Sequence, residues 1–302
     1  MPGRFASRLL ALAFGLALAT TAAAQPGAPL PLPATQVGNC ETKQLLASDP
    51  DSGMTMRAIA VLPPGAPPGP WKVLVLLHGL GGSARSWLEA TTVVPQLASE
   101  MRAGSLAPTL ILLPDGGNGY WADWIDGRHP YGSLVLRLMD VARQRYPLAE
   151  GPQHAAIVGA SMGGFGALSL ALREPARFGM VVALSATDLA IAVADAPMRA
   201  CYVNVVGAPA SASKLAEINP IARVRAGAGA GVRFLLAWGD REARKFKEGG
   251  ALLFRALRRA KRRVERRVVR GGRHGWQRAW APLHPWWTSA LRAHFGAKTA
   301  RP

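Results

Sequence analysis

Short apolar runs alternate with longer amphipathic segments along most of the 302-residue chain. The run 72–78 is almost continuously apolar, which is typical of a strand that is covered on both faces of a parallel sheet. Such runs predict strands at 55–61, 72–78, 109–113, 155–160, 180–185, 232–238 and 264–269. Helical periodicity predicts helices at 92–103, 134–146, 162–173 and 251–262, and a last helix that ends near residue 295. This alternation predicts an α/β fold with a mostly parallel central sheet and helices on both faces.

Two connecting stretches depart from the pattern. The proline- and glycine-rich stretch 63–70 predicts a turn between early strands. The stretch 188–230 has weak periodicity and many alanines and glycines, and we expect it to cover the functional site as a small cap region. No internal repeat or second domain is indicated. We therefore assign residues 54–296 to one catalytic domain and 297–302 to a C-terminal tail.

Residues 1–24 have the features of a secretory signal peptide. A short basic start precedes an apolar stretch that is too short to span a bilayer comfortably, and Ala22-Ala23-Ala24 provides an A-x-A cleavage site. An uncleaved N-terminal anchor helix is the alternative. Residues 25–53 form a proline-rich linker and N-terminal segment, and no later segment is apolar for long enough to span a membrane. We expect a soluble mature protein that is periplasmic or secreted.

Export changes the interpretation of Cys40 and Cys201. In an oxidising compartment the pair could form a disulfide, and two free thiols are about as well supported by the sequence. Neither cysteine belongs to a C-x-x-C pair, and no histidine cluster has metal-ligand spacing, so we expect no structural zinc. Nothing in the sequence indicates a cofactor.

The net charge of +18 is concentrated between Arg241 and Arg273. One interpretation is attraction to an anionic envelope polymer. The other, which we favour, is a solvated helix face followed by an edge strand. Nucleic acid is not expected as a partner, because the chain is predicted to be exported and no basic motif is interleaved with aromatic residues.

The most informative motif is Gly159-Ala160-Ser161-Met162-Gly163, which lies between a predicted strand and a predicted helix. A G-x-S-x-G sequence in this setting forms a sharp turn that presents the serine hydroxyl as a nucleophile. The same turn places the N–H of Met162 at a helix N-terminus, where it can stabilise developing negative charge.

A serine hydroxyl needs a general base to become a nucleophile. Among the six histidines, His274 lies in a glycine-rich loop after the last predicted strand, where an α/β-hydrolase places its histidine. The acid should follow the strand 232–238, where Asp240 and Glu242 compete, and Asp188 is a weaker third candidate. The second oxyanion donor should come from the loop 78–82, in which we choose the N–H of Leu80 and expect His78 to shape the loop.

Tryptophans surround these motifs in the sequence. Trp87, Trp121, Trp124 and Trp276 are candidates for lining an acyl or sugar pocket, and Trp280 is a further one. Large aromatic side chains also pack cores, and we expect about half of these residues to do so.

Taken together, the motifs resemble the family known as "Putative esterase", α/β-hydrolases that include esterase D-like hydrolases, feruloyl esterases and mycolyltransferases. The resemblance covers roughly residues 54–296 and rests on Leu77-His78-Gly79-Leu80, Leu113-Pro114-Asp115-Gly116, the serine motif and Gly272-Arg273-His274-Gly275-Trp276. It implies Ser161 as nucleophile, His274 as base, and Leu80 and Met162 as oxyanion donors. The family acid stands three residues after a strand-ending glycine, which implies Glu242 in preference to Asp240.

Three functions follow as hypotheses. The leading one is an exported serine esterase that hydrolyses a carboxylic ester, either a small ester or an acylated saccharide, through an acyl-enzyme. Acyl transfer to a sugar or lipid hydroxyl uses the same intermediate, so the sequence does not separate the two reactions. A non-catalytic module that binds envelope polysaccharide is the third, and a complete set of serine, histidine and acid disfavours it.

Overall fold

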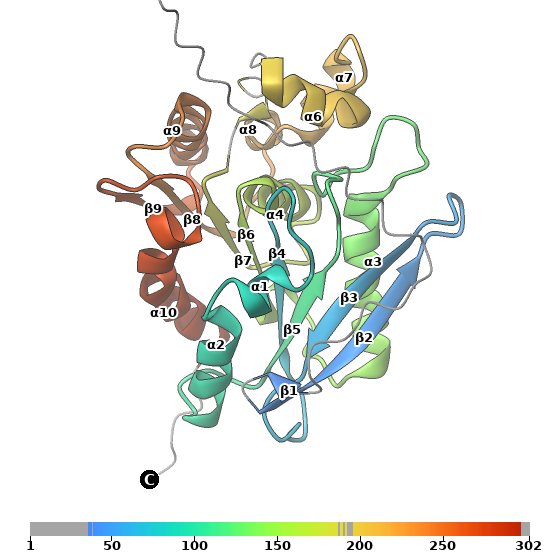
Figure 1. Ribbon diagram of the computed structural model, residues 1–302, viewed down its shortest axis with the longest axis vertical. Helices are drawn as coiled ribbons and strands as arrows, with labels where there is room; N and C mark the ends of the chain where they lie inside the picture. The colour runs from blue at the N-terminus through green and yellow to red at the C-terminus, as the bar shows by residue number, and fades with distance from the viewer. Residues whose placement is uncertain (1–35, 38, 187, 190, 192–195, 297–302) are drawn as a thin grey trace, which may run out of the picture. The chain divides into compact units, whose positions relative to one another are not determined.

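The computed structural model describes residues 36–37, 39–186, 188–189, 191 and 196–296 (Figure 1). The predicted signal peptide, most of the proline-rich linker and the C-terminal tail lie outside the described residues. Within the described part, every helix is too short or too polar to cross a membrane.

The described strands form one nine-stranded sheet in the order β1-β2-β3-β5-β4-β6-β7-β8-β9. Pairs from β1 to β5 along this order are antiparallel, and pairs from β5 to β9 are parallel. The strands are β1 (Gln36–Val37), β2 (Cys40–Ser48), β3 (Thr55–Val61), β4 (Lys72–Leu77), β5 (Thr109–Pro114), β6 (Ala155–Ala160), β7 (Met180–Leu184), β8 (Arg233–Gly239) and β9 (Arg263–Val269). The prediction of a mostly parallel central sheet is therefore confirmed.

Helices cover both faces of this sheet. They are α1 (Ser86–Glu89), α2 (Val93–Arg102), α3 (Tyr131–Arg145), α4 (Met162–Arg173), α6 (Ala196–Val206), α7 (Ala212–Ile218), α8 (Pro220–Arg225), α9 (Arg244–Arg259) and α10 (His284–Phe295), with short turns η1 (Pro152–His154), η2 (Trp276–Trp280) and η3 (Ala281–Leu283). Side chains alternate along β4 because successive residues of a strand point to opposite faces. Val73 and Val75 join the core formed with α3 and α4, whereas Leu74 and Leu76 join the core formed with α2 and α10.

Predicted and observed elements agree best in the centre of the sheet. The predictions at 55–61 and 155–160 coincide with β3 and β6, and the remaining predicted strands agree within one or two residues. The prediction missed β1 and β2, which it had placed in an N-terminal segment. In β2 buried and exposed residues alternate, as in an antiparallel strand with one solvated face, so no continuous apolar run marks it.

Helix α9 begins at Arg244, seven residues before the predicted start. The pair Gly249-Gly250 lowers the helical propensity there, and both glycines are buried in the helix. The ring of Trp238 in β8 lies where a side chain of Gly250 would be, with the nearest ring atom 2.6 Å from the position of an added Cβ. Tertiary packing therefore extends the helix through a stretch that propensity alone disfavours.

The weakly periodic stretch 188–230 contains α6, α7 and α8. In the view of Figure 1, α6 and α7 lie above α4. Tyr202 of α6 packs against Phe165 of α4 and against Tyr120, with ring centroids 5.7 and 4.1 Å apart. The hydroxyl of Ser169 in α4 donates to the carbonyl of Ile218. This cap region therefore rests on α4 and on the loop that contains Tyr120.

Cys40 lies in β2 and Cys201 in α6, and the disulfide that the sequence allowed between them is not formed. Burial raises the pKa of the Cys40 thiol. The basic segment forms α9 and β9, and β9 is the last strand of the sheet with exposed arginines. This arrangement is the solvated helix face and edge strand that the sequence favoured.

Candidate active site

The candidate residues follow the carboxyl ends of neighbouring parallel strands. Ser161 follows β6, Ser185 follows β7, Glu242 follows β8 and His274 follows β9. Parallel strands end at one edge of a sheet, which is where ligands bind in open α/β folds. The topology thus brings together residues that are up to 113 positions apart in the sequence.

Ser161 lies in a sharp turn between β6 and α4, with φ 56° and ψ −116°. A non-glycine residue with positive φ is strained by about 1–3 kcal/mol, and the surrounding structure must hold it. The N–H of Ser161 donates to the carbonyl of Leu184 at 2.8 Å. Gly159 allows the turn, because an added Cβ there would lie 2.0 Å from the carbonyl oxygen of Gly163.

His274 lies between the serine and a carboxylate. Its Nε2 is 2.9 Å from Oγ of Ser161, and its Nδ1 is 3.3 Å from Oε2 of Glu242. The ring of Phe246 stacks on the imidazole with centroids 4.0 Å apart, and Trp280 meets it edge-on at 5.0 Å. These aromatic contacts fix the plane of the imidazole and leave both nitrogens directed at their partners.

Glu242 is buried, with 4% of its surface exposed. Its Oε1 accepts hydrogen bonds from Oγ of Ser185 at 2.6 Å and from the N–H of Gly239 at 3.0 Å. Asp240, the competing acid, is exposed and accepts from the N–H of Gly271 at 2.7 Å. The structure therefore brings Glu242 to the histidine and places Asp240 in a turn.

The sequence did not single out Ser185. Its hydroxyl accepts from Nε1 of Trp280 at 2.7 Å and donates to Glu242, so it links an indole to the buried carboxylate. Ser185 also has a positive φ of 53°, and its N–H donates to the carbonyl of Ala237 just as that of Ser161 donates to Leu184. A polar residue directly after a buried strand at the carboxyl edge was the available signal.

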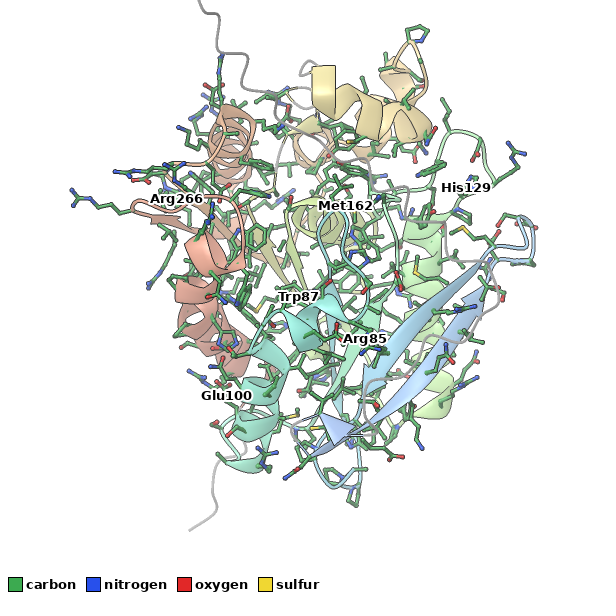
Figure 2. The ribbon with its side chains drawn as sticks, in the orientation of Figure 1. Arg85, Trp87, Glu100, His129, Met162 and Arg266 are labelled. Atoms are coloured by element: carbon green, nitrogen blue, oxygen red, sulfur yellow. The ribbon has the colours of Figure 1, made fainter. Side chains whose placement is uncertain are left out.

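Met162 follows Ser161 directly, and Leu80 follows Gly79, where an added Cβ would lie 3.6 Å from Cβ of Ser161. Met162 is the first residue of α4 and is labelled in Figure 2. A residue at the start of a helix has no intrahelical acceptor for its N–H. Leu80 lies in the loop after β4, and its side chain is 47% exposed.

The loop that contains Leu80 is tied to the loop after β5. The N–H of Gly81 donates to Oδ1 of Asn118 at 2.9 Å, and the N–H of Gly116 donates to Nε2 of His78 at 3.2 Å. Nε1 of Trp121 donates to the carbonyl of His78 at 3.1 Å. His78 therefore shapes the loop, as the sequence predicted, and burial lowers the pKa of its imidazole.

The four predicted pocket tryptophans separate into two pairs. Trp87 and Trp121 are 3% and 1% exposed, so burial removes them from direct substrate contact and gives them packing roles. Trp124 and Trp276 are half-buried, and Trp276 packs edge-on against Trp87 at 5.8 Å. Only the second pair has surface that a substrate can reach.

Residues that could hold a metal ion are not grouped in the described part of the chain, where no three His, Cys, Asp or Glu side chains come together. The chemistry that the described residues offer is that of a hydroxyl, an imidazole and a carboxylate in a hydrogen-bonded row.

The chain is similar to several known proteins. A curated acetyl esterase of Caldicellulosiruptor saccharolyticus is 28% identical over 127 residues, which are 42% of this chain and 45% of that protein. The chain thus aligns with less than half the length of this relative. The solved structure of FphF, a fluorophosphonate-binding serine hydrolase of Staphylococcus aureus, has a TM-score of 0.69 at 21% identity and covers 86% of this chain and 100% of that one.

An S-formylglutathione hydrolase of Agrobacterium tumefaciens has a TM-score of 0.70 at 17% identity, and the match covers 86% of this chain and 98% of that one. At these identities the two structures show the α/β-hydrolase fold. The family model described as "Putative esterase" matches residues 51–278, which is most of the chain. The protein therefore belongs to this esterase family.

Proposed function

We propose that this protein is an exported serine carboxylesterase that hydrolyses a carboxylic ester through an acyl-enzyme at Ser161. The observation that carries the proposal is the hydrogen-bonded row from Ser161 through His274 to Glu242. Membership of the esterase family supports the same reaction class. A serine, a histidine and a buried carboxylate in this order are the machinery of acyl transfer on many unrelated folds.

Acylation begins when Oγ of Ser161 attacks the ester carbonyl carbon and its proton passes to Nε2 of His274. The imidazolium then gives that proton to the alcohol oxygen as the C–O bond breaks, which leaves the acyl group on Ser161. Water enters, loses a proton to His274 and attacks the acyl carbon. Collapse of the second intermediate releases the carboxylic acid and restores the serine hydroxyl.

Glu242 acts on the histidine. An accepting carboxylate at Nδ1 keeps the proton on that nitrogen, so that Nε2 has its lone pair directed at the serine. The carboxylate also stabilises the imidazolium that forms in each half-reaction. The bonds from Ser185 and Gly239 to Oε1 leave Oε2 for the histidine, which supports this role for Glu242.

The N–H groups of Met162 and Leu80 stabilise the oxyanion of each tetrahedral intermediate in this proposal. Met162 contributes the positive end of the α4 dipole, where a developing negative charge is favoured. Removal of one such donor in other enzymes costs about 10²–10³ in kcat. The hydrogen bonds from Gly81 to Asn118 and from Gly116 to His78 hold the loop of Leu80 before the substrate binds, which supports this role for its N–H.

The substrate class that we favour is a small acyl group on an alcohol or saccharide oxygen. The curated relative is named an acetyl esterase, and Trp276, two residues after His274, offers a half-buried aromatic surface for the acyl group. If an acceptor alcohol replaced water, the same acyl-enzyme would pass its acyl group to that alcohol. A test of hydrolysis must therefore include acceptor alcohols.

Export is the part of the proposal that rests on residues 1–24 alone. Cleavage after Ala24 would leave Gln25 as the first residue of the mature chain. Intact-mass measurement of protein recovered from the extracytoplasmic fraction should give the mass of residues 25–302. Recovery of the full-length mass from membranes would favour an uncleaved anchor.

Hydrolysis of p-nitrophenyl esters from acetate to palmitate tests the reaction, with and without sugar or lipid alcohols as acceptors. We expect Ser161→Ala to lower kcat by at least about 10³-fold, because the nucleophile is lost. The matched control is Ser99→Ala, which removes an exposed hydroxyl in α2. A fluorophosphonate probe should add its mass to Ser161 in the wild type only, and equal activity in folded Ser161→Ala would exclude this mechanism.

A further inference from the structure

A groove of about 290 Å³ lies between α8 and α9, and its lining does not include Ser161, His274 or Glu242. The two helices lie side by side in Figure 1 and pack against one another. The floor consists of apolar side chains, among them Ile221, Val224 and Leu252. The rim carries Arg225, Arg255 and Arg259.

The floor combines one exposed leucine with two buried aliphatic side chains. Leu252 is 36% exposed and belongs to the few large hydrophobic side chains in the described part of the chain that face solvent. Beside it, Val224 and Ile221 are almost fully buried, at 1% and 6% exposed. Leu252 therefore gives the groove an apolar side chain that a ligand can contact.

The rim concentrates positive charge without a compensating acid. The lining of the groove contains no carboxylate, and none of the three arginines forms an ion pair with a described residue. The nearest acids in the sequence are engaged elsewhere: Glu217 pairs with Lys214, Glu248 pairs with Arg244 and Glu265 pairs with Arg233. Guanidinium groups around one groove repel one another, and an anion between them would relieve that repulsion.

Helix dipoles account for part of this arrangement. Arg225 and Arg259 lie in the last turns of α8 and α9, where the partial negative charge of a helix C-terminus favours a cation. Arg255 lies one turn earlier in α9, outside the last turn. Neither the position of Arg255 nor the exposure of Leu252 follows from the dipoles.

Hydrogen bonds from Arg262 hold together the ends of the two helices that form the groove. Nε of Arg262 donates to the carbonyl of Ala228 at 2.9 Å, and its Nη2 donates to the carbonyl of Gly227. These bonds tie the chain after α8 to the end of α9. A site that is already formed loses less free energy on binding than one that must first be ordered.

We propose that this groove binds a carboxylate that carries a medium-length apolar tail, such as a fatty acid anion. A carboxylate accepts paired hydrogen bonds from a guanidinium, and the tail would cover Leu252 and the neighbouring floor. The volume has room for about ten groups of the size of a water molecule, which makes decanoate a suitable probe. The site is separate from Ser161, although its ligand belongs to the chemical class of the acid that ester hydrolysis would release.

Isothermal titration with decanoate, below its micelle concentration, tests the proposal. The wild-type protein and Ser161→Ala should bind with the same Kd, because the groove does not involve the nucleophile. The double variant Arg255→Gln/Arg259→Gln should raise the Kd at least tenfold. The control Arg258→Gln/Arg263→Gln removes the same charge from exposed arginines beside the groove and should leave the Kd within twofold.

Leu252→Gln supplies the apolar arm of the test, and it should raise the Kd while thermal unfolding stays unchanged. Tight binding of neutral decanol would overturn the role of the arginines, and equal binding of acetate would overturn the role of the floor. Equal losses in the two arginine pairs would show diffuse attraction to the basic surface. No binding by the wild type, or binding that neither pair affects, would also overturn the proposal.

Discussion

The two halves of the candidate catalytic row are held in different ways. On the nucleophile side, one continuous segment, 155–173, supplies strand, turn and helix in the centre of the sheet. On the acid and base side, Glu242 and His274 come from separate loops after β8 and β9, near the edge of the sheet. The first arrangement is local in sequence, whereas the second depends on long-range contacts.

Both sides use the same device to bring main chains together. An added Cβ at Gly239 would lie 2.2 Å from the carbonyl oxygen of Gly272, much as one at Gly159 would clash with Gly163. The contact at Gly159 joins residues four apart, and the contact at Gly239 joins segments 33 apart. The comparison shows that a short motif specifies the turn of Ser161, while the hydrogen-bonded row from Glu242 to His274 requires the assembled sheet edge.

The largest expected effect comes from the acid. Glu242→Gln removes the charge that stabilises the imidazolium and disturbs the histidine tautomer, so kcat should fall by about 10³–10⁴-fold. Asp240→Asn is the matched control, because Asp240 accepts from Gly271 and not from the histidine, and it should change kcat by less than about threefold. Steady-state kinetics on a p-nitrophenyl ester measures both, and a reversal of the two effects would show that the wrong carboxylate has been assigned.

Ser185 tests whether the long-range side depends on its supporting contacts. Ser185→Ala leaves Nε1 of Trp280 and Oε1 of Glu242 each without one partner, so we expect about a tenfold lower kcat and a stability loss of about 1–3 kcal/mol. Ser169→Ala is the control, since it removes a buried hydroxyl that donates to Ile218 in the cap. It should lower stability without changing kcat, and equal kcat losses in both variants would indicate a general loss of packing.

Acidification probes His78, whose carbonyl oxygen lies against Gly163 in the first turn of α4. Burial holds the pKa of this histidine below its ordinary value of 6.5, although its hydrogen bond to the carbonyl of Gly79 and the carboxylate of Asp115 at 3.8 Å oppose the shift. The unfolded chain therefore takes up this proton first, and the stability that neutral His78 provides above pH 6.5 is lost as pH falls through its folded pKa. Protonation also turns the Nε2 acceptor for Gly116 into a donor.

Urea unfolding between pH 7.5 and pH 5 measures this effect. The loss should be about 1.4 kcal/mol for each unit between the folded and unfolded pKa. His78→Gln should reduce this pH dependence, because it removes the buried imidazole. The same pH dependence in wild type and His78→Gln would show that other buried groups dominate.

The smallest effect is expected at the hydrogen bond between Asn118 and the loop that contains Leu80. Asn118→Ala removes the acceptor for the N–H of Gly81, and water can replace it because the bond is exposed. We expect kcat to fall about three- to tenfold with little change in stability. The control is Arg128→Ala, at an exposed position of the loop that also contains Asn118, and it should leave kcat unchanged. An unaltered kcat in both variants would mean that the remaining contacts are enough to hold the loop of Leu80 in place.

The centre of the fold could be predicted because its strands are buried on both faces. Continuous apolar runs define β4 and β6, and the G-x-S-x-G motif needs only its neighbours to adopt its turn. The antiparallel strand β2 escaped prediction because its polar face interrupts the run. The cap helices escaped because their alanine-rich segments have weak periodicity and owe their packing to Phe165 and Tyr120.

The site was predictable in its residue types and incomplete in its contacts. Spacing left Asp240 and Glu242 open, since both follow β8 and only the approach of the β9 loop separates them. Ser185 and Phe246 have no local motif, because their roles arise from where β7 and α9 lie relative to His274. Trp121 resembled a pocket residue in sequence, yet its indole bonds to the carbonyl of His78 in the core.

The arginines of β9 have a consequence for how copies of the protein meet in solution. No described strand pairs with the outer edge of β9, so its main chain is open to a strand from another molecule. Arg266 covers Phe254 on one face of the sheet, and Arg267 covers Trp286 on the other. Figure 2 labels Arg266 at this edge of the sheet. Edge-to-edge alignment of two copies would set like charges against each other, and this repulsion weakens as salt rises. Colloidal stability of the protein should therefore be lowest at high ionic strength or where these arginines are neutralised.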